Sequence, residues 1–301
     1  MIKAVFRNLK DPRGIAIKLI AKLSPLIKSD RLYLSMRYWL FMKKKLNLDN
    51  PCTFNEKLNW LKINYHLPIY TKLVDKYEVK KIVADLIGEE YVIPTLGVWD
   101  NVDDIDFDNL PDKFVLKCTH DSGGLVVCKD KSKLNIESAK KKLAYALKRN
   151  YFNQSREWGY KYVPARIIAE RYMEDSTTHA LNDFKFFCFD GEVKLLFIAT
   201  ERSAEVKFDF FDMDFKHLDI TNAHPHSSTK IAKPVTFEKM KELAAILSKG
   251  HPFMRIDLYE VDSRVYFGEY TLYHNGATLP FEPESIDYQM GEWITLPEKN
   301  T

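Results

Sequence analysis

A lysine and a pair of glycines lie close together in the stretch from Phe114 to Lys129. Two short apolar runs flank a polar turn, Lys117 lies in the first run, and Ser122 precedes Gly123-Gly124 in the turn. This pattern predicts a β-hairpin. Glycine backbone can approach a ligand closely, its N–H groups can face an anion, and a lysine adds a compact positive charge. Phosphate binding is therefore one interpretation, and a hairpin turn with a solvated lysine is the other.

Two carboxylates lie on a second pair of predicted strands, much later in the chain. A short polar turn joins the run that begins at Arg255 to the run that ends at Thr271. Because side chains alternate along a strand, Arg255 shares a face with Asp257, and Glu269 shares a face with Thr271. Asp257 and Glu269 could converge on a hard cation such as Mg²⁺, which prefers oxygen ligands. A solvated sheet face with a cross-strand Arg–Asp pair is the alternative.

The order of these features resembles the TupA-like ATP-grasp family, which is associated with teichuronopeptide and capsular polysaccharide biosynthesis. The resemblance runs from about residue 28 to residue 297 and is carried by the hairpin and by four further motifs. These motifs are Thr53-Phe54-Asn55-Glu56-Lys57-Leu58, Asp75-Lys76-Tyr77, Asp183-Phe184-Lys185-Phe186 and Glu269-Tyr270-Thr271. It implies an α+β ATP-grasp fold, in which two α+β subdomains grip ATP, preceded by a mainly helical N-terminal region.

The resemblance also implies how ATP is held. Lys76 would reach the α-phosphate, Lys117 would be the second phosphate lysine, and Lys185 would be a further phosphate contact. Ser122, Gly123 and Gly124 would form a mobile flap over the β- and γ-phosphates. A hinge segment would contact adenine mainly through backbone groups, with a methionine stacked on the base: Glu170, Arg171, Tyr172 and Met173.

By the same resemblance, Asp257 and Glu269 would bind Mg²⁺. Thr271 stands where many ATP-grasp enzymes have asparagine, so it is expected to be a weak ligand. Arg255, with Lys117, would act in catalysis by stabilising an acyl-phosphate and the tetrahedral intermediate. Asp121 departs from the family pattern because a carboxylate inside a phosphate flap should repel the triphosphate unless it turns away.

The function that this implies is an ATP-dependent carboxylate–amine ligase. It would form an amide through an acyl-phosphate, adding an amino acid to a uronic-acid-containing cell-surface polysaccharide or its precursor. Its partners would be ATP, a glycan carboxylate acceptor and an amino acid that supplies the amine. A glycosyltransferase of capsular or O-antigen biosynthesis is an alternative, although the chain has no DxD motif beside a nucleotide-sugar pattern. A non-catalytic glycan-binding relic is a second alternative, motivated by Asp121 and Thr271.

Charge is unevenly distributed along the 301 residues. Residues 1–50 carry 12 Lys or Arg and 3 Asp, so their net charge is +9 although the whole chain carries only +3. The apolar, lysine-bearing stretch 15–23 predicts a helix that either touches anionic lipid or packs on its own protein. It is too short to span a membrane, and no signal peptide is evident. We therefore expect a cytoplasmic protein, peripheral to the inner membrane face, and no nucleic-acid partner because no binding motif accompanies the basic excess.

The resemblance and the patterning together divide the chain into four parts. These are a basic helical extension (1–50), a pre-grasp region (51–112), a first ATP-grasp subdomain with the flap (113–166) and a second with the metal site (167–301). Helices are predicted over 31–48, from 55, and over 71–87, 136–150 and 237–249; further strands are predicted over 92–98, 166–173, 184–189, 193–200 and 207–213. His224-Pro225-His226 resembles a metal-binding tract, but without a third ligand nearby in sequence it favours a loop.

Overall fold

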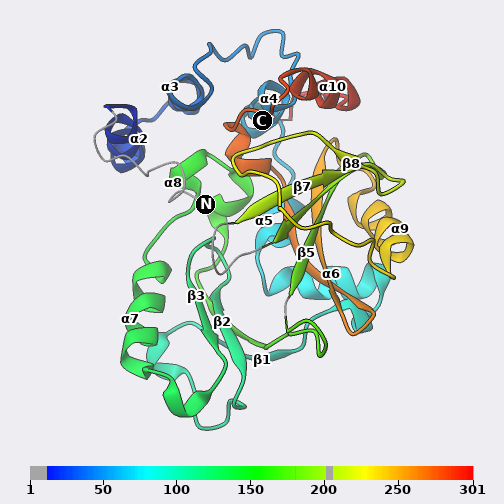
Figure 1. Cartoon of the computed structure of the whole chain (residues 1–301). Coiled ribbons are helices and arrows are strands. Elements are labelled where there is room, and N and C mark those ends of the chain that lie inside the picture. The colour runs from blue at the N-terminus through cyan, green and yellow to red at the C-terminus, as the bar shows by residue number, and fades with distance from the viewer. Residues whose placement is uncertain (1–11, 180, 201–205, 301) are drawn as a thin grey trace.

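The computed structural model describes residues 12–179, 181–200 and 206–300, and it contains two antiparallel sheets with helices around them (Figure 1). The first sheet has the order β1-β4-β2-β3. Its strands are β1 (Thr95–Trp99), β2 (Phe114–Cys118), β3 (Leu125–Cys128) and β4 (Ile167–Arg171). Helix α7 (Ile136–Leu147) packs on β2 and β3, where Leu143 and Ala146 join a small apolar core with Phe114 and Leu116. The hairpin predicted from Lys117 and the glycine pair is confirmed.

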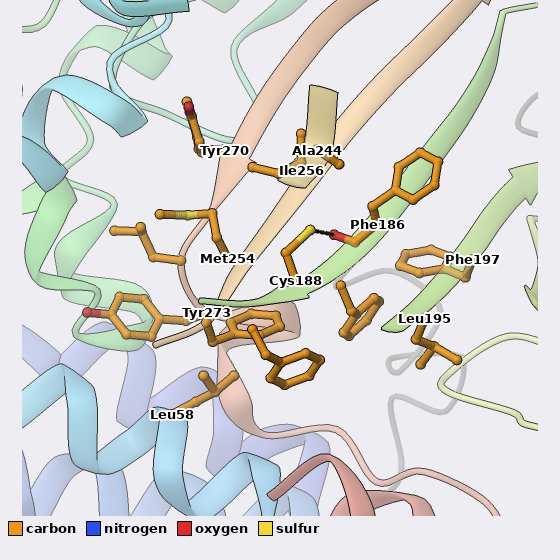
Figure 2. Close-up of a cluster of buried hydrophobic side chains, with 14 of the residues drawn as sticks. Leu58, Phe186, Cys188, Leu195, Phe197, Ala244, Met254, Ile256, Tyr270 and Tyr273 are labelled. Carbon is orange, nitrogen blue, oxygen red and sulfur yellow. Dashed lines mark hydrogen bonds between the residues drawn. The ribbon is translucent and has the colours of Figure 1, made fainter. Parts of the chain in front are cut away.

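The second sheet has the order β10-β9-β5-β6-β7-β8 and carries the larger core. Its strands are β5 (Asn182–Phe189), β6 (Glu192–Thr200), β7 (Lys207–Phe211), β8 (His217–Leu218), β9 (Met254–Val261) and β10 (Arg264–Thr271). Helix α9 (Phe237–Ser248) covers β5, β6 and β9. Figure 2 shows part of this core, in which the Cys188 thiol points to the backbone oxygen of Phe186 beside Phe197 and Met254. Burial of these side chains removes apolar surface from water, which is the main stabilising contribution to the fold.

Most of the remaining helices precede the first sheet; α8 (Phe152–Ser155) lies between β3 and β4 in sequence, and α10 (Ser285–Trp293) follows the second sheet. Those before the first sheet are α2 (Pro12–Leu23), α3 (Asp30–Met42), α4 (Phe54–Asn64), α5 (Ile69–Val74) and α6 (Glu78–Ile87). Short 3₁₀ turns are η1 (Ser24–Leu26), η2 (Glu89–Tyr91), η3 (Val102–Asp104), η4 (Lys131–Lys133), η5 (Trp158–Tyr162) and η6 (His274–Ala277). A capping box between Thr53 and Glu56 starts α4, which lies beside α10 at the top of Figure 1.

The predicted helix over 71–87 was wrong in one respect that matters for function. The structure has two helices there, α5 and α6, because the Asp75 carboxylate accepts hydrogen bonds from the N–H groups of Tyr77 and Glu78 and starts a new helix. In the break between them, the backbone N–H of Lys76 donates to the oxygen of Thr119, just after β2. The interruption therefore places Lys76 beside the glycine hairpin.

Other boundaries differ less. The helix predicted over 31–48 ends at Met42, where Lys43 adopts a left-handed conformation with φ of 59°. Strand β8 and helices α8 and α10 were not predicted, but the α+β class is confirmed. The domain limits stay predictions; β1 and β4, which lie on either side of 113–166 in sequence, share a sheet with the hairpin. No described helix is both long enough and apolar enough to cross a bilayer.

Candidate active site

A cleft of about 870 Å³ lies between the two sheets. One wall comes from the hairpin and from the helix break, with Lys76, Lys117 and the glycine pair. Strands β5, β9 and β10 form the opposite wall with Lys185, Arg255 and Glu269. The structure thus brings together side chains that the sequence separates by almost 200 residues.

The lysines on the hairpin side are held by one buried carboxylate. Glu170 lies on the central strand β4, with 2.5 Å between its Oε2 and Nζ of Lys117 and 2.6 Å between its Oε1 and Nζ of Lys80. Burial alone would raise the pKa of Glu170, but the two ammonium groups outweigh it and lower that pKa to about 2. Nζ of Lys76 donates to the backbone oxygen of Asp121 at 2.8 Å. Burial lowers the pKa of Lys76 from its usual value.

The glycine turn has different requirements at its two glycines. A Cβ on Gly124 would lie 2.6 Å from Cβ of Ala146 and 2.8 Å from Sγ of Cys118, so the close packing of α7 on the hairpin requires glycine there. A Cβ on Gly123 would lie 3.3 Å from Nη1 of Arg149 and 3.6 Å from Oδ2 of Asp121, so no atom approaches it closer than 3.3 Å. Gly123 and Ser122 are exposed and line the cleft, so their backbone is accessible to a ligand.

Asp121 does not present a free charge to the cleft. Its side chain is fully buried, and its Oδ2 lies 3.4 Å from Nη1 of Arg149. An arginine beside the carboxylate offsets the negative charge that the sequence places in the turn. Neither carboxylate oxygen has a hydrogen-bond partner among the described residues, so the ion pair with Arg149 is the contact that offsets this charge beside the glycine turn.

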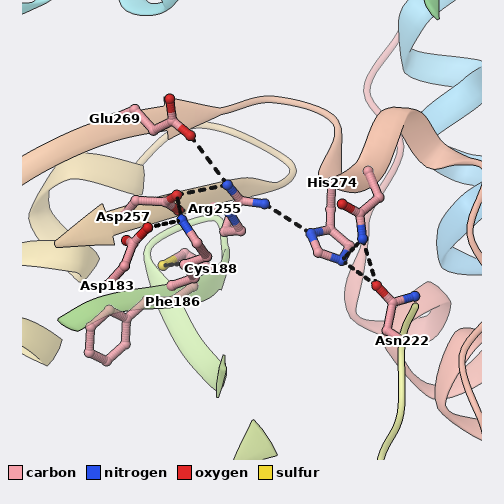
Figure 3. Close-up of polar contacts among 10 residues, drawn as sticks. Asp183, Phe186, Cys188, Asn222, Arg255, Asp257, Glu269 and His274 are labelled. Carbon is pink, nitrogen blue, oxygen red and sulfur yellow. Dashed lines mark hydrogen bonds and ion pairs between the residues drawn. The ribbon is translucent and has the colours of Figure 1, made fainter. Parts of the chain in front are cut away.

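On the opposite wall, sheet register brings a lysine into a group of carboxylates. Lys185 on β5 is paired with Asp257 on β9. Its Nζ contacts the Asp257 carboxylate and lies 2.6 Å from Oδ2 of Asp183. Figure 3 shows this group beside Arg255, whose guanidinium contacts both Asp257 oxygens at 2.7 Å. Burial raises the pKa of Asp257, and the two neighbouring cations oppose that rise.

A bulge in β10 sets the position of Glu269. The register shifts between Phe267 and Glu269, so that Glu269 falls opposite Asp257. At Gly268 a Cβ would lie 2.9 Å from the Tyr259 ring and 3.0 Å from the backbone oxygen of Asp257, so the bulge requires a glycine. The Glu269 side chain keeps 44% of its surface exposed and lies 3.5 Å from Nη2 of Arg255. Burial would raise its pKa, but Lys185, among other cations, outweighs this and lowers it.

Arg255 is held from its other side by a neutral histidine. Its Nη1 lies 3.1 Å from Nδ1 of His274, and Nε2 of His274 lies 3.0 Å from Oδ1 of Asn222, as Figure 3 shows. Burial, and then the charge of Arg255, lower the pKa of His274 far below its usual value. A neutral ring can accept from the guanidinium at Nδ1 and donate at Nε2, so this chain fixes the direction of Arg255.

The predicted adenine residues do not all face this cleft. Glu170 lines it through its side chain, whereas Arg171, Tyr172 and Met173 line a neighbouring hollow of about 530 Å³. Met173 is buried in a small apolar cluster, and Nζ of Lys129 lies 5.5 Å from the Tyr172 ring centroid. Thr271 lies opposite Arg255 in the sheet and is half-buried.

Several residues of the site were not among the predicted ones. Asp183 carries a signal that was overlooked, because strand alternation places it on the same face as Lys185. Lys80 lies in the first turns of α6, and its approach to Glu170 depends on the packing of this helix near β4, which the local sequence does not reveal. Asn222 reaches His274 from a distant loop, and no local pattern marks that contact.

The chain is similar to one protein family and to several solved structures. The model of the TupA-like ATPgrasp family matches residues 56–295. Among solved structures, D-alanine–D-alanine ligase from Bacillus anthracis is 16% identical with a TM-score of 0.40, and the match covers 67% of this chain and 57% of that one. The Helicobacter pylori enzyme of the same name is 14% identical (TM-score 0.42; 82% and 70% covered), and D-cycloserine synthetase DcsG is 16% identical (TM-score 0.40; 75% and 70%). No curated protein matches the sequence. Because the family model spans most of its length, the chain belongs to the TupA-like ATP-grasp family.

Proposed function

We propose that the protein is an ATP-dependent carboxylate–amine ligase that forms an amide through an acyl-phosphate. The observation that carries the proposal is the convergence of four cations on one cleft: Lys76 and Lys117 beside the glycine turn, and Lys185 and Arg255 on the opposite wall with Glu269. Phosphoryl transfer demands little covalent chemistry from a protein, which mainly positions the reactants and neutralises their charge. A cleft with these cations at fixed positions meets that demand.

The lysines act on the triphosphate in this account. Lys76 contacts the α-phosphate, Lys117 and Lys185 contact the phosphates beyond it, and the backbone of Ser122 and Gly123 covers them. The ion pairs of Glu170 and of Asp257 orient Lys117 and Lys185 before a nucleotide arrives. Such preorganisation reduces the entropy that binding must remove. Backbone groups from Glu170 to Met173 contact the adenine.

Mg²⁺ fits the donor set on β9 and β10, because carboxylate oxygens are its preferred ligands. Asp257 and Glu269 would hold it, with Thr271 as a weak contributor. Both oxygens of Asp257 already contact cations, whereas Glu269 is partly exposed and offers the more accessible oxygens. When bound, the ion neutralises charge on the β- and γ-phosphates.

The reaction proceeds in two balanced steps. A carboxylate oxygen of the acceptor attacks the γ-phosphorus of ATP, and the bond between that phosphorus and the oxygen bridging it to the β-phosphorus breaks. The products are an acyl-phosphate and ADP. An amine then attacks the acyl carbon, and the tetrahedral intermediate collapses to an amide with release of phosphate and a proton. Arg255 stabilises the charge on the acyl-phosphate and on this intermediate, and its chain of contacts through His274 keeps its guanidinium directed at the reacting group.

We further propose that the acceptor is a uronic-acid carboxylate of a cell-surface polysaccharide or its precursor and that the amine comes from an amino acid. The family's association with such glycans supports this class of substrate. Apolar side chains, among them Phe197, Phe208 and Pro225, also line part of the cleft beside its charged groups. A lining of apolar side chains with a few polar groups is typical of sites for small ligands.

The basic N-terminal helix supports a cytoplasmic protein that contacts the inner membrane face. Helix α2 exposes Ile15, Leu19 and Leu23, which recur every four residues and so lie on one side of the helix. Exposed Lys22 lies next to this apolar stripe. Apolar side chains with flanking lysines are typical of helices that bind anionic lipid. The wild type should sediment with phosphatidylglycerol vesicles, whereas a Leu19→Glu variant should stay in the supernatant. Equal fractions of both proteins in the pellet would contradict a contact between α2 and lipid.

The ligase proposal is tested by measuring ADP release from ATP with the uronic acid alone, with the amino acid alone and with both together. Multiple turnovers of ATP should require a uronic acid and an amino acid together, and the product should contain an amide bond. Consumption of a nucleotide sugar without ADP release would instead indicate a glycosyltransferase. Absence of any turnover, together with glycan binding, would indicate a non-catalytic relic.

A further inference from the structure

We infer that Asp209, His217 and His226 form a binding site for a transition-metal ion of the Zn²⁺ class, separate from the cleft. One ligand atom from each side chain lies within 4.8 Å of the others. Asp209 is on β7, His217 is on β8, and His226 lies in the loop that follows. His226 belongs to the His224-Pro225-His226 tract, which has no third ligand nearby in sequence. In the folded chain, Asp209 and His217 lie beside His226.

The hydrogen bonds around these side chains suit a metal ligand set. Nε2 of His226 lies 2.9 Å from the backbone oxygen of Ile220, and a proton on Nε2 leaves the lone pair on Nδ1 for a metal. Oδ2 of Asp209 accepts the N–H of Ser227 at 3.1 Å, while its Oδ1 lies 3.0 Å from Nε2 of His217. Metal-binding histidines and carboxylates usually make such outer contacts, which fix their orientation.

Donor chemistry distinguishes this site from the one proposed for Mg²⁺. Two imidazoles and one carboxylate suit Zn²⁺ and similar ions, whereas Mg²⁺ prefers an all-oxygen set. Three protein ligands leave a fourth position for water. Because the His217 side chain is 45% exposed, solvent and a metal ion can reach the cluster, while Asp209 is almost fully buried.

A metal ion bound to these three side chains would restrict the motion of the loop around residues 222–226, which lines part of the cleft. The backbone oxygen of Pro225 accepts the N–H of Phe208 at 3.1 Å, and Ala223, His224 and Pro225 line the cleft. The same loop carries Asn222, which contacts His274. Joining β7, β8 and His226 through one ion would therefore stabilise the loop that positions this part of the cleft. The role proposed is structural.

The test is Zn²⁺ binding by the full chain without a histidine tag, measured by competition with a chelating dye in millimolar Mg²⁺. Wild type should bind one equivalent, and His217→Ala and His226→Ala should each weaken binding by roughly 100-fold or more. His224→Ala is the matched control for metal affinity, because this histidine lies in the same tract outside the cluster. Glu269→Gln should also retain the site, which separates it from the cleft carboxylates.

Hydrogen exchange supplies a readout that concerns the loop itself. Zn²⁺ should slow exchange of the backbone amides of residues 220–227 in the wild type and leave them unchanged in His226→Ala. Circular dichroism would establish that the exposed His217 variant is folded. Unchanged Zn²⁺ affinity in both histidine variants, or no Zn²⁺ bound by the wild type, would overturn the inference and would leave the ligase proposal untouched.

Discussion

Glu170 and Lys117 lie on neighbouring strands of the first sheet and form a buried ion pair, with 2.5 Å between Oε2 and Nζ. Lys80 contacts the other oxygen of the same carboxylate. A single buried carboxylate therefore lies between two lysines at the wall of the cleft and offsets one of their two positive charges. Removing one member of such a buried pair is costly because the other charge loses its compensation.

The first prediction is a pH-dependent loss of stability from Glu170→Gln. The pKa of Glu170 is about 2 in the folded protein, below the 4.5 of an unperturbed glutamate. Its stabilisation is therefore fully present above about pH 4.5 and is lost as pH falls towards 2. The difference in the free energy of unfolding between wild type and variant should be on the order of 3 kcal/mol at pH 6 and should shrink by pH 3. Urea unfolding measures it, with exposed Glu298→Gln as control. A difference that is independent of pH would contradict the ion-pair account.

The second prediction concerns nucleotide binding. Mg-ATP should raise the melting temperature, because a ligand at about 100 times its Kd stabilises the folded state by about 2.7 kcal/mol. Lys117→Ala should reduce the shift, whereas Lys72→Ala, an exposed lysine on α5, should not. Differential scanning fluorimetry measures both. A melting temperature unchanged by millimolar Mg-ATP would exclude the proposed nucleotide site.

The third prediction concerns the carboxylates on β9 and β10. Glu269→Gln should lower kcat by roughly 100-fold or more, because an interaction with developing charge is lost, and its partial exposure means that the fold should survive. Asp257→Asn should also abolish turnover, but it leaves Arg255 without its bidentate partner and should destabilise the protein as well. Thr271→Ala should have a smaller effect than either. Near-normal activity in both carboxylate variants would place the metal elsewhere.

The fourth prediction separates the two glycines of the hairpin turn. Gly124→Ala should destabilise the protein, because the new methyl group would overlap Ala146 and Cys118. In Gly123→Ala the new methyl group would lie 3.3 Å from the end of the Arg149 side chain and 3.6 Å from Asp121, so stability should stay within about 0.5 kcal/mol of the wild type. If Gly123 covers the phosphates, its variant should raise KM for ATP without lowering the melting temperature. A KM for ATP equal to that of the wild type in Gly123→Ala would contradict the proposal that Gly123 covers the phosphates.

Local patterns were sufficient to predict the hairpin and the two strands that carry the carboxylates. A glycine turn between apolar runs determines the hairpin of Lys117, and strand alternation places Asp257 on the face of Arg255. Glu269 falls opposite Asp257 because of the bulge at Gly268, which alternation does not reveal. The sequence also indicated β5, β6 and the Asp190-Gly191 turn between them, where both residues have positive φ.

Contacts that depend on the order of strands in a sheet could not be predicted from such local patterns. Lys185 faces Asp257 because β5 lies between β6 and β9, which no property of either strand reveals. The break before α6 was missed because capping by Asp75 competes with an apolar pattern that continues through it. Likewise, His226 gains Asp209 and His217 only after β7 and β8 have paired.

The central claim is that a carboxylate is activated as an acyl-phosphate, and oxygen transfer tests it most directly. A uronic acid labelled with ¹⁸O in its carboxylate, incubated with ATP and an amino acid, should yield an amide and inorganic phosphate that carries one ¹⁸O, because that oxygen bridges carbon and phosphorus in the intermediate. Arg255→Ala should slow the appearance of labelled phosphate severely, since this residue acts on charge that develops during the reaction. An amide formed with unlabelled phosphate, or a glycosidic bond formed without ADP release, would contradict the account.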